Sequence, residues 1–260
     1  MNFARGSGLI RGFKWEMPLL HNLPIKIIGH RGSPREEPEN TLRSFRRALD
    51  LGAWGVELDV RLSRDGRLVV IHDPAVDRTT NGRGMVQDLT FAQLRELDAG
   101  RGEPIPALEE VVDLVRGRGG RLLVELKAPE AAGPLLRLFQ KRRLFDDACL
   151  ISFWHPVVKT LKEQEPRLQA GVLMVGCPVD PGAVARAAGA DFLILNYAYV
   201  NRELADAVKA AGLKLIVWNI DEVDTLKFFL EFHPDAICTN RPGEIIDYLK
   251  SAGKFRLLPE

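Results

Sequence analysis

Short apolar runs alternate with amphipathic segments along most of the chain. Each run holds five or six residues rich in Ile, Val and Leu, a pattern typical of a strand that is buried on both faces. We expect eight such strands, at 25–29, 55–60, 121–126, 148–152, 169–174, 191–195, 214–218 and 235–239.

The segments between these runs repeat their apolar residues at the spacing of a helix. Strands that alternate with helices through short links are parallel and joined by right-handed crossovers. Eight of them in 260 residues indicate an α/β fold, a closed (β/α)8 TIM barrel. A doubly wound open sheet is the alternative, but the chain has no GxGxxG loop to support it. The predicted helices lie at 40–51, 131–143, 155–164, 180–188, 201–211 and 222–231.

The interval between the second and third barrel strands is longer than the others. Asp65-Gly66, between two apolar stretches, predicts a hairpin with a two-residue turn. Symmetric pairing about that turn would place Asp59 directly opposite His72, with Glu57 two residues away on the same face.

Residues 74–105 follow the hairpin and are rich in Gly, Thr and Asn, with one helical patch at 90–98. We expect them to form a small cap subdomain, inserted between the second and third barrel strands beside the active face. A surface loop without a role is the alternative. A single barrel domain would then cover 25–250, between an N-terminal arm at 1–24 and a C-terminal tail at 251–260.

The composition argues against several classes of protein. A net charge of +1 offers no broad basic field for nucleic acid. No apolar run reaches the ~20 residues of a membrane helix, and charged residues such as Arg5 and Arg11 interrupt any signal peptide. Three scattered cysteines are too few for a disulfide framework, so we expect buried thiols and a cytoplasmic protein. The oligomeric state stays open.

Three acidic residues stand within the apolar runs: Glu57 and Asp59 in the second, and Glu125 in the third. Parallel barrel strands open into one mouth, so these side chains would face one cavity. Three carboxylates repel one another unless a cation neutralises them, and an all-oxygen ligand set favours one Mg²⁺, Ca²⁺ or Mn²⁺ ion. Ion pairs with Arg31 and Lys127 are the structural alternative.

Two histidines lie at the same mouth: His30 follows the first strand and His72 follows the hairpin. Histidine titrates near neutral pH, so the pair can serve as general acid and general base. Arg31 and Lys127 are suited to hold the non-bridging oxygens of a phosphate. Simple charge balance is the alternative for both cations.

Two aromatic residues stand where strands end, Phe153 and Trp218. They would form a wall for the ligand, with barrel packing as the alternative. Asn40 precedes a predicted helix, where capping is the ordinary role, and it could also support the loop that carries His30 and Arg31.

A series of short motifs runs along the chain in a fixed order. Together these motifs resemble the glycerophosphodiester phosphodiesterase family, over roughly residues 25–250. They are Gly29-His30-Arg31-Gly32, Pro38-Glu39-Asn40-Thr41, Glu57-Leu58-Asp59-Val60, Asp65-Gly66, His72-Asp73, Arg78-Thr79-Thr80-Asn81-Gly82, Ile105-Pro106-Ala107-Leu108-Glu109-Glu110, Glu125-Leu126-Lys127, Ser152-Phe153, Val217-Trp218-Asn219 and Thr239-Asn240-Arg241-Pro242.

The resemblance implies a phospholipase C-like barrel with a small insertion, and metal-dependent hydrolysis of glycerophosphodiesters to sn-glycerol 3-phosphate and an alcohol. Family members often have Thr-Val-Asn after the tryptophan, where this chain has Asn219-Ile220-Asp221. By position, the metal ligands would be Glu57, Asp59 and Glu125, the acid–base pair His30 and His72, the phosphate-holding residues Arg31 and Lys127, and the cleft-lining residues Phe153 and Trp218.

Two other functions remain open at this stage. One is phospholipase C- or D-like cleavage of a phospholipid or lysophospholipid on the same barrel. The other is a non-catalytic phosphate-binding module, which would lack an acid, a histidine or the lysine; all of these are present. The sequence leaves three points open: the alcohol released, the order in which the histidines act, and the choice between water attack and a cyclic phosphate.

Overall fold

The structure is a computed structural model that describes residues 25–252. The predicted arm at 1–24 and most of the predicted tail at 251–260 lie outside these residues.

Eight parallel strands close into a ring, because β1 pairs with β2 on one side and with β9 on the other. The prediction of a (β/α)8 TIM barrel is confirmed. The ninth strand, β3, pairs antiparallel with β2 as an extension of the sheet. The strands are β1 (Lys26–His30), β2 (Gly55–Leu62), β3 (Leu68–Val70), β4 (Arg121–Leu126), β5 (Ala148–Ser152), β6 (Gln169–Met174), β7 (Phe192–Asn196), β8 (Lys214–Trp218) and β9 (Ala236–Thr239).

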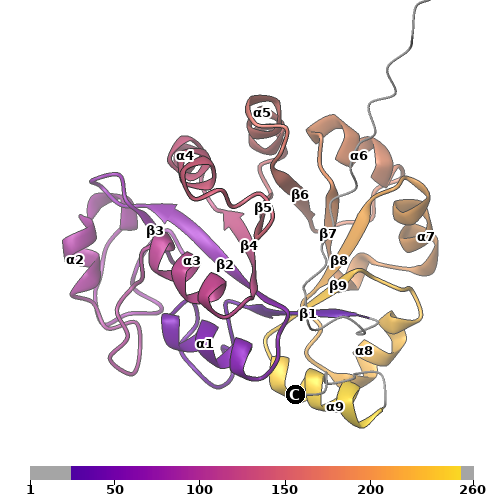
Figure 1. Cartoon of the computed structure of the whole chain (residues 1–260), viewed down its shortest axis with the longest axis horizontal. Coiled ribbons are helices and arrows are strands. Elements are labelled where there is room, and N and C mark those ends of the chain that lie inside the picture. Colours follow the sequence, from indigo (N-terminus) through magenta and orange to yellow (C-terminus); the bar gives the residue numbers. More distant parts are fainter. Residues whose placement is uncertain (1–24, 253–260) are drawn as a thin grey trace, which may run out of the picture.

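Helices surround the ring, and the hairpin with α2 projects from one side of it (Figure 1). All six predicted helices are present; α3 and α9 were not among them. The α-helices of residues 25–252 are α1 (Leu42–Asp50), α2 (Phe91–Arg95), α3 (Leu108–Gly117), α4 (Ala132–Arg142), α5 (His155–Gln164), α6 (Pro181–Ala188), α7 (Arg202–Ala210), α8 (Val223–Leu230) and α9 (Pro242–Ser251).

The alternation of side chains along each strand divides the core into two layers. On β2, Val56, Leu58 and Val60 face outward and pack against the helices. Glu57 and Asp59 face the interior of the ring, where both are buried. Two inward residues in a row are therefore acidic, at the end of the strand that opens into the mouth of the barrel.

The hairpin between β2 and β3 has a different register from the predicted one. Val60 pairs with Val70, and the backbone N–H of Ile71 donates to Asp59 O at 3.0 Å. The loop has three residues rather than two, and Gly66 ends it with a left-handed φ of 79°. The prediction that His72 lies directly opposite Asp59 was therefore wrong.

The insertion after β3 has a small apolar core of its own. Val76, Val86 and Leu94 are buried there, and they pack with Val69 and Ile71 of the hairpin. Helix α2 begins with a capping box in which Thr90 and Gln93 bond to each other's backbone N–H groups. Residues 74–105 thus form an ordered unit attached to β3.

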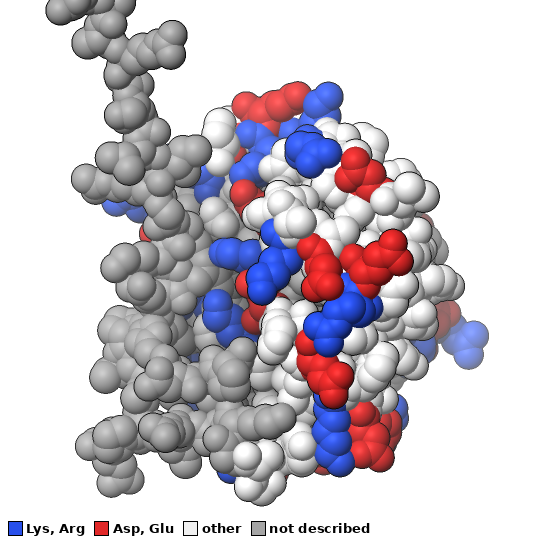
Figure 2. Space-filling model, turned by 90° about the vertical axis from the view of Figure 1, so that its right-hand side faces the viewer, with Lys and Arg blue, Asp and Glu red and all other residues white. Residues whose placement is uncertain are grey.

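The outer surface carries charges of both signs. On the face shown in Figure 2, Lys and Arg alternate with Asp and Glu, and no large patch of one sign forms. Among residues 25–252 no helix is long and apolar enough to cross a membrane. Cys149 and Cys238 are buried as predicted, but Cys177 is exposed in the loop after β6, so the prediction of three buried thiols was wrong for this residue.

Candidate active site

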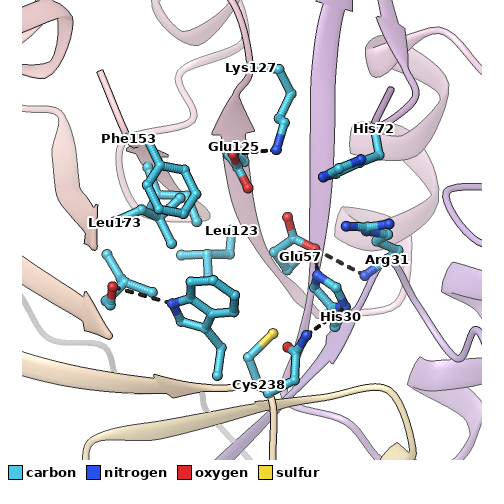
Figure 3. Close-up of a pocket in the computed structure, with 14 residues that line it drawn as sticks. His30, Arg31, Glu57, His72, Leu123, Glu125, Lys127, Phe153, Leu173 and Cys238 are labelled. Carbon is cyan, nitrogen blue, oxygen red and sulfur yellow. Dashed lines mark hydrogen bonds and ion pairs between the residues drawn. The ribbon is translucent and has the colours of Figure 1, made fainter. Parts of the chain in front are cut away.

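Ionisable and apolar side chains share one cleft at the carboxyl ends of the strands. Charged residues from β1, β2 and β4 lie on one side, and apolar residues on the other (Figure 3). Eight of the ten predicted site residues line the cleft: His30, Arg31, Glu57, His72, Glu125, Lys127, Phe153 and Trp218. The other two, Asp59 and Asn40, are buried behind it and bond to each other.

Three carboxylates meet on the charged side. Glu57 and Asp59 are two residues apart on β2, and Glu125 on β4 is the register partner of Asp59. One oxygen from each lies within 4.8 Å of the others. Burial and the neighbouring charge of Asp59 raise the pKa of Glu57 well above its ordinary value and the pKa of Glu125 to about 7.

Two cations sit among these acids. Arg31 Nε lies 3.2 Å from Asp59 Oδ2, and Lys127 Nζ lies 3.5 Å from Asp59 Oδ1 and 2.7 Å from Glu125 Oε1. Burial alone would raise the pKa of Asp59, but Arg31, then Lys127, hold it below its usual value. Asn40 Nδ2 adds a hydrogen bond of 2.8 Å to Asp59 Oδ2.

The cations and hydrogen bonds leave some carboxylate oxygens unsatisfied. Glu57 Oε1 and Asp59 Oδ1 are buried and accept no hydrogen bond from the described part of the chain. Buried polar atoms are rarely left without a partner. Glu57 Oε1 can therefore bind a hard cation, and so can Asp59 Oδ1, whose partner at this point is Lys127 Nζ, in an ion pair at 3.5 Å. The donor set fits the predicted Mg²⁺, Ca²⁺ or Mn²⁺ ion.

His30 lies at the end of β1 with its two ring nitrogens in different surroundings. Nδ1 is 2.7 Å from Asn240 Oδ1, and Nε2 is 3.8 Å from Glu57 Oε2. Burial, assisted by the charge of Arg31, lowers the pKa of His30. The ring is therefore held toward its neutral form.

His72 reaches the same cleft from the segment after β3. Its Nδ1 is 2.5 Å from Asp73 Oδ1. Burial lowers the pKa of His72, while the charge of Asp59 and the bond to Asp73 act in the opposite direction. The two histidines thus differ in their partners, an amide for His30 and a carboxylate for His72.

A second group of ions connects the insertion to the site. Arg78 binds both Asp73 and Glu39, with Nε 2.6 Å from Asp73 Oδ2 and Nη2 2.7 Å from Glu39 Oε1. Glu39 also accepts a hydrogen bond from Arg31 Nη1 at 2.9 Å. The partners of His72 and Arg31 are thus tied to each other by one arginine.

The opposite wall of the cleft is apolar. Phe153 and Trp218 meet edge to face, with ring centroids 6.0 Å apart. Trp218 Nε1 is already bonded to Ile194 O at 3.3 Å, so the indole has no donor left for a ligand. Leu123 and Leu173 complete this wall.

The predicted set did not include several residues that contact the site. Asn219 lines the cleft, Asn240 bonds to His30, and Asp221 bonds to Asn240. Asn219 and Asn240 each directly follow an apolar strand. The same signal identified His30, and it applies equally to these two amides.

The sequence is similar to those of known proteins. Residues 30–244 match the model of the glycerophosphoryl diester phosphodiesterase family. The chain is 35% identical to a glycerophosphodiester phosphodiesterase of Caldanaerobacter subterraneus subsp. tengcongensis, over 87% of this chain and 98% of that protein. It is 32% identical to a glycerophosphodiester phosphodiesterase of Bacillus altitudinis, over 85% and 96% respectively.

The fold is also similar to solved structures. One is a phosphodiesterase of Oleispira antarctica in complex with the product sn-glycerol-3-phosphate. It superposes with a TM-score of 0.81 at 26% identity, covering 88% of this chain and 97% of that one.

Proposed function

Because this chain belongs to the glycerophosphoryl diester phosphodiesterase family and is a phosphoric diester hydrolase, we propose that its substrates are glycerophosphodiesters. The products would be sn-glycerol 3-phosphate, which a similar enzyme binds, and an alcohol. The reaction would belong to lipid and glycerol metabolism. We place the enzyme in the cytoplasm, where its buried thiols Cys149 and Cys238 would stay reduced.

The observation that carries the proposal is the cluster of Glu57, Asp59 and Glu125 beside two histidines. The raised pKa values of Glu57 and Glu125, which reflect the crowding of buried carboxylates, and the unsatisfied oxygens support the proposal that this cluster binds a divalent cation. A bound Mg²⁺, Ca²⁺ or Mn²⁺ ion would supply positive charge to the phosphate oxygens.

The chain's own residues then divide the remaining tasks. Arg31 and Lys127 hold the phosphate oxygens and offset the charge that develops on them. One histidine removes a proton from the nucleophile, and the other donates a proton to the oxygen of the leaving alcohol. The nucleophile is water, or the neighbouring glycerol hydroxyl through a cyclic phosphate that water opens. Phe153 and Trp218 hold the organic part of the substrate.

The test is to incubate the purified protein with glycerophosphocholine, glycerophosphoethanolamine, glycerophosphoglycerol and glycerophosphoinositol. Mg²⁺, Ca²⁺ and Mn²⁺ are each supplied in turn, and glycerol 3-phosphate is measured. We expect glycerol 3-phosphate from at least one combination of substrate and metal ion, and none when chelator is in excess. Absence of glycerol 3-phosphate from every combination would refute the function.

Substitution of the histidines tests the acid–base pair. We expect His30→Ala and His72→Ala each to lower kcat by about 10²-fold or more with the fold retained. The matched control is His233→Asn, because His233 is exposed outside the cleft. Near wild-type turnover by either alanine variant would remove that histidine from the mechanism.

One observation favours the second candidate function, cleavage of a lysophospholipid. Large hydrophobic side chains are exposed in the loops after β5, β6 and β7, which are adjacent strands of the ring. Phe153 belongs both to this rim and to the apolar wall of the cleft. The rim residues are Phe153, Trp154, Val175, Val179, Tyr197 and Tyr199, six of the eight exposed large hydrophobics within residues 25–252.

An apolar rim that continues an apolar wall suits an acyl chain attached to the glycerol. If this function holds, Trp154→Ser with Val179→Ser should slow cleavage of micellar lysophosphatidylcholine several-fold and leave hydrolysis of glycerophosphocholine unchanged. Met85→Ser is the control, because Met85 is exposed on the insertion. No cleavage of the lysophospholipid, and no sedimentation with vesicles, would eliminate this candidate.

A further inference from the structure

Asn240 connects His30 to a group outside the cleft. Asn240 follows β9, which pairs with β1 in the ring. This pairing brings it next to His30, although the two residues are 210 positions apart in the sequence. Its Oδ1 lies 2.7 Å from His30 Nδ1. An amide oxygen can only accept a hydrogen bond, so Nδ1 must carry the hydrogen of the ring.

Asp221 fixes the direction in which the Asn240 amide faces. Asp221 Oδ2 accepts from Asn240 Nδ2 at 2.7 Å, and Oδ1 accepts from Asn240 N at 2.7 Å. Thr239 Oγ1 also donates to Oδ1, at 3.1 Å. A half-turn of the amide would direct its oxygen at this carboxylate. The NH₂ group therefore faces Asp221 and the oxygen faces His30.

This arrangement selects one tautomer of the imidazole. A neutral histidine carries one ring hydrogen, and here that hydrogen is on Nδ1. The lone pair is then on Nε2, which points toward the cleft and lies 3.8 Å from Glu57 Oε2. A ring in this form can accept a proton from a group in the cleft.

Asn219 is consistent with the same tautomer. Its amide nitrogen is 3.2 Å from His30 Nδ1, and its Oδ1 is buried without a hydrogen-bond partner among the described residues. The two ends of an amide have nearly the same shape. A half-turn would bring the unsatisfied oxygen to Nδ1–H as a second acceptor.

We propose that Asp221 and Asn240 are positioning residues that hold His30 in the tautomer with a free Nε2. The proposal rests on the proposed function, in which His30 transfers a proton. Both residues act through His30.

The first test is Asp221→Asn. An amide at position 221 can donate to Asn240 Oδ1, so the Asn240 side chain is free to turn and present its NH₂ group to His30. The ring hydrogen then moves to Nε2. We expect kcat to fall about 10²-fold with KM changed by no more than about twofold, because the loss lies in proton transfer.

The direct readout is the ¹⁵N NMR spectrum of histidine-labelled protein at pH 8, where the lowered pKa of His30 keeps its ring neutral. The His30 signals, assigned by their loss in His30→Asn, should show an unprotonated Nε2 in the wild type and a protonated Nε2 in Asp221→Asn.

The double variant Asp221→Asn with Asn240→Asp provides a rescue. The new amide donates to the new carboxylate, which again accepts from His30 Nδ1. We expect most of the lost kcat and the original tautomer to return. The control is Asp180→Asn; Asp180 caps α6 and does not line the cleft, so this change should alter neither. Melting temperatures report whether each variant folds.

Wild-type protein with the hydrogen on Nε2 would overturn the proposal, as would an Asp221→Asn variant whose kcat falls while the tautomer stays the same. An Asp221→Asn variant that keeps both the kcat and the tautomer of the wild type would also overturn the proposal. Failure of the proposed function is distinguishable, because it shows as an inactive wild type whatever the NMR spectrum reports.

Discussion

Glu125 shows how burial and neighbouring charge set the chemistry of one side chain. Only 8% of the residue is exposed, and it lies beside Asp59 on the adjacent strand. Its pKa rises from 4.5 to about 7 despite a hydrogen bond from Lys127. A bound cation would compete with this proton, so cation binding and the pH dependence of folding are linked.

The first prediction concerns Glu125→Gln. A raised pKa means that the folded state holds a proton that the unfolded state releases, so this residue's contribution to stability falls as pH rises from 4.5 to about 7. Glutamine does not titrate. Between pH 4.5 and 7.5, urea unfolding in chelator should show the variant gaining up to about 3 kcal/mol over the wild type.

The histidines do not obscure this comparison, since both proteins carry them. Addition of a divalent cation at pH 7.5 should restore stability to the wild type more than to the variant. If the free energy of unfolding changed with pH in the same way for both proteins, the pKa of Glu125 would not be raised.

At the scale of elements, the hairpin between β2 and β3 depends on one left-handed residue. Gly66 has a φ of 79° with no atom near the position of a Cβ, so the cost of a side chain there is conformational. We expect Gly66→Ala to lower the free energy of unfolding by about 1 kcal/mol, measured by urea denaturation.

The control is Gly117→Ala in α3, where the backbone is helical and no atom lies within 4 Å of the new Cβ. This change should be neutral or stabilise the protein by up to about 1 kcal/mol. Equal effects of the two substitutions would contradict the role of the left-handed turn.

The same hairpin shows where prediction from sequence stopped. The short apolar runs predicted the barrel strands. Polar residues in or directly after these runs identified His30, Glu57 and Glu125 as site residues. The register could not be read, because Asp65-Gly66 suits both two- and three-residue loops. Gly66 has a positive φ in either loop, whereas Asp65 has one only in the two-residue type I′ turn, and here Asp65 is not among the residues with positive φ. Asn240 carried the same strand-end signal as His30 but was not selected. Asp221 could not be found from the sequence, because its role depends on bonds to Asn240, 19 residues away, and through it on His30.

At the scale of the whole molecule, the insertion and the barrel are joined at the site. Arg78, from the insertion, holds Asp73 and Glu39 together, and these are the partners of His72 and Arg31. The insertion therefore affects both a proton-transfer group and a phosphate-holding group.

We expect Arg78→Ala to lower kcat roughly 10- to 100-fold, because partners of this kind orient the groups that contact substrate. Arg78→Lys should recover little, since a lysine cannot bond to two carboxylates with a planar fork. Arg83→Ala is the control, because Arg83 is exposed in the same insertion. Steady-state kinetics that do not distinguish Arg78→Ala from Arg83→Ala would contradict this connection.

The pairing of β1 with β9 also has a consequence for biosynthesis. His30 is among the first described residues to leave the ribosome, but its partner Asn240 emerges 210 residues later. Contacts so distant in sequence form late in folding. During translation the nascent chain would therefore display its histidines and acids without β9, and catalytic competence would come only after Asn240 has been synthesised.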